Sequence, residues 1–147
     1  MGLQLRQVSA ENFQECIKLK VKDGQRDFCA SNLYSIAESK VEPLAIPVCI
    51  YADGVMVGFA MYGPEQSDNG MIMSIDRFMI DRRFQGRGYG KLAFAELIET
   101  IRSNYRYKEI YLSYTPENVI AEKLYGSFGF TKTGEFSGGE CVAKLVL

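Results

Sequence analysis

The sequence contains no histidine and no tryptophan, and its four cysteines stand far apart. Because Ser-His-Asp and Cys-His schemes of nucleophilic catalysis need an imidazole, both are excluded. Histidine-based zinc sites are excluded too, and no cysteine pair has the Cys-x-x-Cys spacing of a metal or redox site, so we expect no bound metal. The cysteines are expected to be small buried side chains without disulfides, as in a reducing cytosol: Cys16, Cys29, Cys49 and Cys141.

Long apolar runs are also absent. None approaches the roughly 20 residues that cross a membrane, and the first residues lack the apolar region of a signal peptide. The net charge of −1 shows no excess of basic residues for binding nucleic acid. We therefore expect a cytoplasmic protein that binds neither nucleic acid nor membrane. The length suits a single domain over residues 1–147.

The most informative stretch is a glycine-rich run that leads directly into a helical pattern. A strand pattern over residues 72–80 precedes it, and an apolar helical pattern over 92–98 follows. Glycines allow several backbone N–H groups to point the same way, and a helix N-terminus carries partial positive charge. The run therefore predicts a pyrophosphate site, made by Gln85, Gly86, Arg87, Gly88, Tyr89, Gly90 and Lys91.

Three phosphate-binding patterns compete for this run. A P-loop requires Ser or Thr after its lysine, and Leu92 stands there, so this pattern fails. Residues 88–93 spell the dinucleotide fingerprint G-x-G-x-x-A, but charged residues 81–85 separate them from the strand, and no acid ends the next expected strand. The third pattern, [Q/R]-x-x-G-x-[G/A], is met from Gln85 and again, in a second register, from Arg83.

A second segment, residues 118–130, reads N-x-x-A-x-x-L-Y-x-x-x-G-F. Its apolar residues share one helical face: Ala121, Leu124, Tyr125 and Phe128. Gly129 can supply the left-handed residue that ends the helix. The two motifs, in this order, resemble the coenzyme A pyrophosphate loop and the second signature of the GNAT superfamily of N-acetyltransferases.

Periodicity predicts the element order β-α-α-β-β-β-α-β-α-β-β, which is that of the GNAT fold. Strands are expected over 3–8, 46–52, 55–62, 72–80, 110–114, from 130 and over 141–147, and helices from Ser9, over 32–41, over 88–104 and from 118. Residues 23–31 and 63–70 are expected to be irregular, and Asp53-Gly54 predicts a hairpin turn. In the third helix Leu92, Ala95, Ile98 and Ile101 or Arg102 are expected to face inward.

The resemblance implies an α+β fold with a mixed, mostly antiparallel sheet that splays in the middle and is flanked by helices. It implies acetyl-CoA as donor and a primary amine as acceptor, joined in a ternary complex by direct attack. By the same resemblance, Phe78, Met79 and Ile80 pair through their main chain with the pantetheine arm, and one N–H polarises the thioester carbonyl. Asn118 is expected to meet the cofactor, and Arg82, Arg83 and Arg87 to contact phosphates or solvent.

Proton transfer is expected to involve a tyrosine and an aspartate. Tyr125 is a competent donor to the leaving thiolate because a phenol stays protonated at neutral pH. Asp76 alternates with Ser74 and Phe78, so the three are expected to share a strand face where Asp76 accepts a proton from the amine. The alternative is a structural pair between Asp76 and Arg77.

The acceptor side is expected in the second helix. Glu38 and Glu42 stand four residues apart, so they lie on one helical face. This acidic face either attracts a polycationic substrate or is merely solvated. Tyr34 is expected to line the substrate cleft beside it. This region resembles bacterial spermine/spermidine acetyltransferases, which implies a polyamine acceptor. A protein N-terminal or lysine acetyltransferase, a non-catalytic acetyl-CoA-binding module and, remotely, a nicotinamide-binding protein remain as alternatives. The resemblance also leaves a homodimer open.

Overall fold

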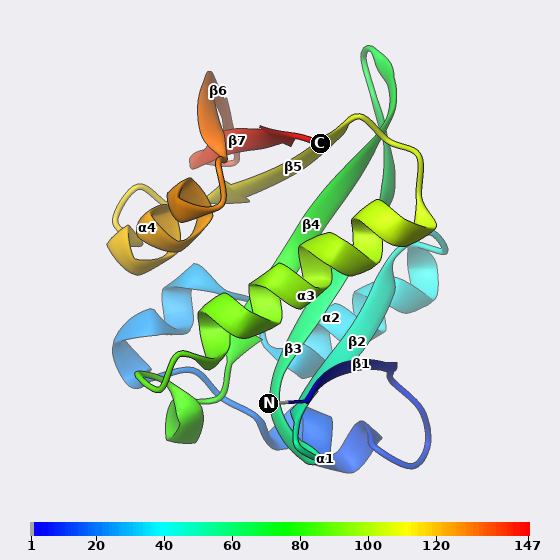
Figure 1. Ribbon diagram of the computed structural model, residues 1–147, viewed down its shortest axis with the longest axis vertical. Helices are drawn as coiled ribbons and strands as arrows, with labels where there is room; N and C mark the ends of the chain where they lie inside the picture. The colour runs from blue at the N-terminus through cyan, green and yellow to red at the C-terminus, as the bar shows by residue number, and fades with distance from the viewer. Residues whose placement is uncertain (1) are drawn as a thin grey trace.

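The computed structural model describes residues 2–147 and shows a seven-stranded sheet flanked by helices (Figure 1). The strand order is β1-β2-β3-β4-β5-β7-β6, and only the β4–β5 pair is parallel. The strands are β1 Leu3–Gln7, β2 Ile46–Ala52, β3 Val55–Ser67, β4 Gly70–Ile80, β5 Glu109–Tyr114, β6 Thr131–Ser137 and β7 Glu140–Val146. The helices are α1 Phe13–Lys18, η1 Asp23–Phe28, α2 Asn32–Val41, η2 Arg82–Phe84, α3 Tyr89–Asn104 and α4 Val119–Ser127, η1 and η2 being 3₁₀ helices. The expected α+β fold and element order are confirmed.

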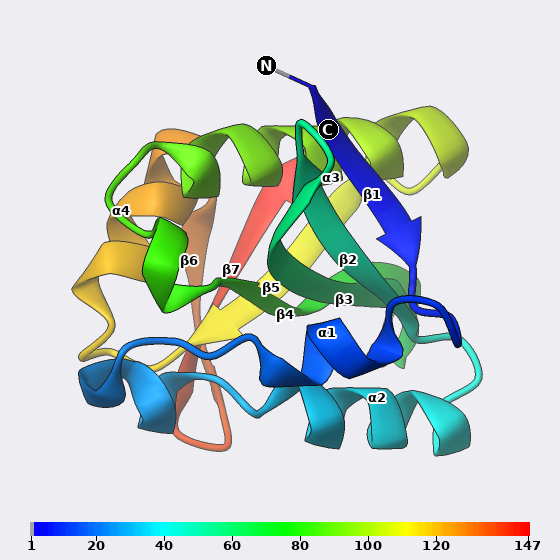
Figure 2. The ribbon, with the colours of Figure 1, turned by 90° about the horizontal axis from the view of Figure 1, so that it is seen from below.

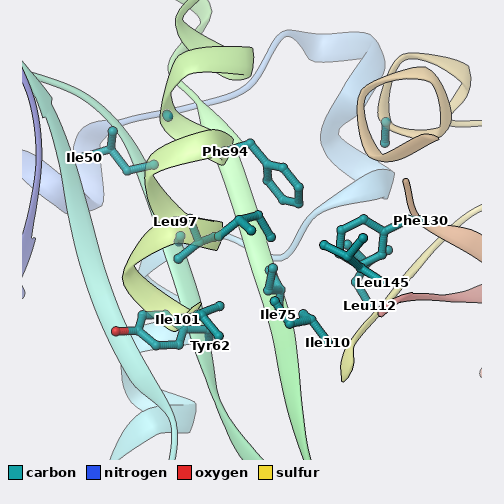
Figure 3. Packing of buried hydrophobic residues seen from close by; sticks show 14 of the residues in the cluster. Ile50, Tyr62, Ile75, Phe94, Leu97, Ile101, Ile110, Leu112, Phe130 and Leu145 are labelled. Atoms are coloured by element: carbon teal, nitrogen blue, oxygen red, sulfur yellow. The ribbon is translucent and has the colours of Figure 1, made fainter. Parts of the chain in front are cut away.

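The helices cover both faces of the sheet (Figure 2). Helices α1 and α2 lie on one face, where Cys16 and Phe59 belong to the smaller apolar cluster. Helix α3 lies on the other face, and its Phe94 and Leu97 are fully buried in the larger cluster (Figure 3). Among the described residues, no helix is long and apolar enough to cross a membrane.

The sheet splays between β4 and β5. These strands pair only at Met73–Ile110 and Ser74–Tyr111, after which they diverge (Figure 1). On its other edge β4 stays paired with β3, but the register shifts: Met61 pairs with Arg77 and Tyr62 with Ile75. Asp76 is therefore the extra residue of a β-bulge. The edge of β4 from the bulge to Ile80 has no strand beside it on the β5 side.

Two local predictions are confirmed. The hairpin between β2 and β3 turns at Asp53 and Gly54, whose φ angles of 50° and 84° are those of a type I′ turn. Helix α4 ends before Gly129, which adopts the left-handed conformation with φ of 97°.

Four local predictions are wrong in detail. Residues 63–70 are not an irregular loop, because β3 continues to Ser67 and β4 begins at Gly70. Residues 23–28 form η1. Asn12, not Ser9, is the N-cap residue of α1. In α3 the buried residues are Ala93, Phe94, Leu97, Ile98 and Ile101, whereas Leu92 and Ala95 are exposed. The predicted residues are three apart, whereas the helix repeats every 3.6 residues. The members of the predicted set therefore do not all lie on the buried face.

Candidate active site

A cleft of about 620 Å³ opens where β4 and β5 part. Its walls come from β4, β5, α4, the glycine-rich turn and the segment from Val21 to Ala30. Of the residues predicted from sequence, those that line it are Asp76, Phe78, Met79, Ile80, Gln85, Gly86, Gly90, Asn118 and Tyr125. The predicted site residues that do not line the cleft are Arg87, Gly88, Tyr89, Lys91, Tyr34, Glu38 and Glu42.

The glycine-rich turn ends the cleft at the start of α3. Gly86 and Gly88 have φ angles of 78° and 86°, in the left-handed region, and Gly88 is the N-cap residue of α3. The first amide bonded back into the helix is that of Leu92, which donates to the Gly88 carbonyl at 3.3 Å. The N–H groups of Tyr89, Gly90 and Lys91 consequently have no partner within the helix. Together with the dipole of this 16-residue helix, they form a site suited to an anion.

Gln85 connects this turn to two other walls of the cleft. Its side-chain amide donates to the Ile80 carbonyl and to Oε1 of Gln25, both at 2.9 Å. The end of β4, the turn and η1 are thereby joined at one residue.

The arginines of this region lie outside the cleft. Nε of Arg83 donates to Oδ2 of Asp81 at 2.7 Å, so Arg83 forms a structural ion pair. The guanidinium groups of Arg83 and Arg87 lie 5.2 and 5.8 Å from the ring centre of Phe84. A phosphate contact by Arg82, Arg83 or Arg87 stays a prediction, and Arg83 would first have to leave its carboxylate.

The bulge changes which side chains share a face of β4. The ring of Phe78 lies edge-on to Phe94 of α3, with centroids 5.1 Å apart, whereas Met79 belongs to the cluster on the opposite face. Ser74 lies near Asp76, because its hydroxyl donates to Oδ1 at 2.9 Å. The prediction that Ser74, Asp76 and Phe78 share a face is therefore wrong for Phe78, because the extra residue inverts the alternation.

Asp76 stands at the cleft as a carboxyl group of raised pKa. The Asp76 side chain is exposed to solvent, but protein atoms of the cleft surround it and displace part of its hydration. This desolvation raises the pKa of Asp76 to about 6. The Ser74 hydroxyl and the Arg77 charge lower the pKa less than burial raises it. Arg77 donates instead to the Asp76 main-chain carbonyl at 2.8 Å and to Glu38 at 3.2 Å. The alternative pair between the Asp76 carboxylate and Arg77 is not seen.

Tyr125 projects from α4 into an aromatic cluster on the cleft wall. Its ring centre lies 5.1 Å from that of Phe94 and 5.7 Å from that of Tyr114. Burial raises the pKa of the Tyr125 hydroxyl well above its ordinary value, and the charges of Cys29 and Glu140 raise it further. The phenol therefore stays protonated through the neutral range. Tyr125 and Asp76 line one cleft from different elements, and their roles as proton donor and proton acceptor stay predictions.

The residues predicted for the acceptor lie elsewhere. Tyr34 is 60% exposed, Glu42 is the C-cap residue beyond α2, and Glu38 is paired with Arg77. Asn118 lines the cleft, and its Oδ1 also caps α4 by accepting from the Ala121 amide at 3.2 Å.

Sequence reasoning assigned no role in the site to several residues that line the cleft, among them Asp27, Cys29 and Glu140. They lie outside both motifs, and only the fold brings them to the site. Cys29 is partly exposed there, unlike the other three cysteines, which are buried as expected.

The model of the acetyltransferase (GNAT) family matches residues 10–130. The chain belongs to this family. It is thus an N-acetyltransferase of the GNAT type. It is 35% identical to a spermine/spermidine N(1)-acetyltransferase of Bacillus subtilis (strain 168), over 98% of this chain and 99% of that protein. A probable spermine N(1)-acetyltransferase of Bacillus subtilis subsp. natto is 34% identical over the same shares.

Solved structures of GNAT enzymes share the fold. An aminoglycoside acetyltransferase in complex with coenzyme A superposes with a TM-score of 0.80 at 16% identity, over 99% of this chain and 95% of that one. The PaiA N-acetyltransferase of Thermoplasma acidophilum, also in complex with coenzyme A, gives 0.71 at 14% identity over 100% of both chains. At these identities the likeness establishes the architecture alone.

Asp81 holds the end of β4 in place beside this site. Its buried carboxylate accepts the Lys20 amide at 2.8 Å, the Arg83 amide at 3.1 Å and Nε of Arg83 at 2.7 Å. Burial opposes ionisation, but these donors outweigh it, so the pKa of Asp81 lies below its ordinary value. The ionised carboxylate joins the chain after α1 to the loop that precedes the glycine turn.

This pKa predicts part of the acid sensitivity of the protein. A depressed pKa contributes stability that is present above the unfolded value of about 3.9 and is lost as pH falls through the folded value. Asp81→Asn should therefore lower the free energy of unfolding at pH 7 and flatten its decline between roughly pH 5 and pH 2. Urea unfolding across this range measures both effects, with Asp68→Asn in the exposed β3–β4 turn as control. Parallel profiles for Asp81→Asn and the unaltered protein would contradict this assignment.

Proposed function

We propose that this enzyme transfers the acetyl group of acetyl-CoA to a primary amine of a polyamine such as spermidine or spermine. The observation that carries the proposal is the cleft itself. An anion-binding turn, an unpaired strand edge, a phenol and a carboxyl group of raised pKa all border one space. The full-length similarity to proteins named as spermine/spermidine acetyltransferases supports the choice of acceptor.

The two ends of this strand edge support a position for the cofactor. The pyrophosphate binds the open amides at the start of α3, beside Ile80. The thioester lies toward the bulge at Asp76. Asp76 is four residues before Ile80, a separation of about 13 Å along a strand. Between them, the edge of β4 from Phe78 to Ile80 pairs with the amides of the pantetheine arm as a further strand would, through the backbone groups that point away from β3; the Ile80 carbonyl already accepts from Gln85. An N–H of this edge stabilises the oxyanion.

The chemistry then needs no covalent enzyme intermediate. The amine loses a proton to Asp76 and its nitrogen attacks the thioester carbonyl carbon. As the tetrahedral intermediate collapses, the C–S bond breaks and the sulfur takes a proton from Tyr125, while the nitrogen loses its second proton to solvent, which reprotonates Tyr125. The products are an N-acetylated amine and free coenzyme A. A chain without histidine can perform each of these steps.

An amine panel tests the proposal directly. Release of free thiol from acetyl-CoA should be fastest with spermidine or spermine, and slower with a monoamine of similar reach, because extra ammonium groups find carboxylates in the cleft. The preference should weaken as salt is added, since the Debye length falls to about 8 Å at physiological ionic strength. Preference for an aminoglycoside, a peptide N-terminus or a lysine side chain would overturn the polyamine assignment. Binding of acetyl-CoA without turnover on any amine would instead indicate a non-catalytic module.

Tyr125→Phe tests the proton donor. The change keeps the ring and its aromatic contacts but removes the hydroxyl, so kcat should fall about 10²- to 10⁴-fold with the Kd for acetyl-CoA little changed. Tyr111→Phe is the matched control, because its hydroxyl donates to Glu109 outside the cleft. Near-normal turnover by Tyr125→Phe would mean that water protonates the thiolate.

Asp76→Asn tests the proton acceptor through its pH profile. With a pKa of about 6, Asp76 is ionised and able to accept a proton at neutral pH, where most amine is still protonated. The variant must rely on amine that is already neutral. Its deficit in kcat/KM should therefore be greatest near neutral pH and shrink as pH approaches about 10. A deficit independent of pH would assign Asp76 to positioning, and Asp68→Asn serves as control.

A further inference from the structure

Glu140 is one of the residues that line the cleft. It is the first residue of β7, pairs with Ser137 across the β6–β7 hairpin and lines the cleft together with Asp76 and Tyr125. The hydroxyl of Ser113 on β5 donates to its Oε1 at 2.8 Å. This bond holds the carboxylate at the end of β5 and leaves it with further acceptor capacity for a ligand.

The charge of Glu140 is not neutralised within the protein. None of the ion pairs among residues 2–147 involves Glu140, Asp27 or Asp76, the three carboxylates that line the cleft. By contrast, the side chain of Glu38 is paired with Arg77. The carboxylates that border the cleft without an ion pair are therefore Asp27, Asp76 and Glu140, whereas Glu38 and Glu42 do not line it.

Glu140 also lies close enough to influence the reacting groups. Its negative charge contributes to the raised pKa values of Tyr125 and Cys29. Compared with Asp27, which is exposed, Glu140 is half-buried and held by Ser113. A carboxylate that is already positioned loses less conformational entropy on binding and is less screened by salt.

We infer that Glu140 determines acceptor specificity by binding an ammonium group of the polyamine other than the one being acetylated. Asp76 receives the proton of the reacting amine, while Glu140 holds a second charge of the same molecule. Monoamines lack this second charge. The inference rests on the proposed function, and it moves the acidic subsite from Glu38 and Glu42 to the β6–β7 hairpin.

Glu140→Gln tests the inference because the amide keeps the size of the side chain and can still accept from Ser113. The KM for spermidine should rise roughly tenfold, the scale of one lost charge pair in a partly desolvated cleft, with kcat and the KM for acetyl-CoA little changed. The kcat/KM for a monoamine of similar reach should change much less, because only the smaller effect of Glu140 on the pKa of Tyr125 is lost. Ser113→Ala should raise the KM for spermidine by a smaller factor, because it only loosens the carboxylate. Glu135→Gln, on exposed β6, is the matched control.

The outcomes separate this inference from the proposed function. A wild-type enzyme that acetylates spermidine, with Glu140→Gln unchanged, overturns the inference alone. Equal losses on spermidine and on the monoamine also overturn it, because Glu140 would then act on the reacting centre. A wild-type enzyme that acetylates other amines but no polyamine overturns the proposed function, and this inference with it. Thermal melting of each variant identifies any loss that comes from unfolding.

Discussion

The separation of β4 from β5 after two paired residues is the constraint on which the site depends. A parallel pair that continued would satisfy the edge of β4 with a neighbouring strand and leave no room for a ligand. The bulge at Asp76 twists β4 at the point where the strands part, as bulges commonly do. A strand edge without a neighbouring strand is normally avoided in a sheet, and its presence inside a cleft supports the proposal that an extended ligand pairs with it.

Burial is the main cause of the pKa shifts at this site. Desolvation raises the pKa of Asp76 to about 6. It also raises the pKa of the Tyr125 hydroxyl, which ordinarily lies well above neutral pH, still higher. In the proposed mechanism, the first group is thereby able to act as the base near neutral pH and the second stays protonated to act as the acid. This division of roles requires no histidine, because a carboxyl group and a phenol in different surroundings can take the two roles.

Much of this architecture could be predicted from local patterns. The glycine run before α3, the Asn118 to Phe130 motif and the Asp53-Gly54 turn each act through neighbouring residues, and the structure agrees with them. The face of α3 and the shared face of Ser74 and Phe78 were predicted wrongly. The α3 error comes from a spacing of three residues in place of the helical repeat of 3.6, and the β4 error comes from extending strict alternation across a bulge.

By itself, the sequence indicated the family through the resemblance of two motifs. It also predicted the strand and helix order and the glycine-rich turn, because these follow from backbone preferences and side-chain spacing within short segments. Only the tertiary structure decided which carboxylates line the cleft. Glu38 is neutralised by Arg77 from a strand 39 residues away, and Glu140 reaches the site because β7 pairs with β5. Charge compensation and convergence on a cleft are properties of residues distant in sequence, and no local pattern records them.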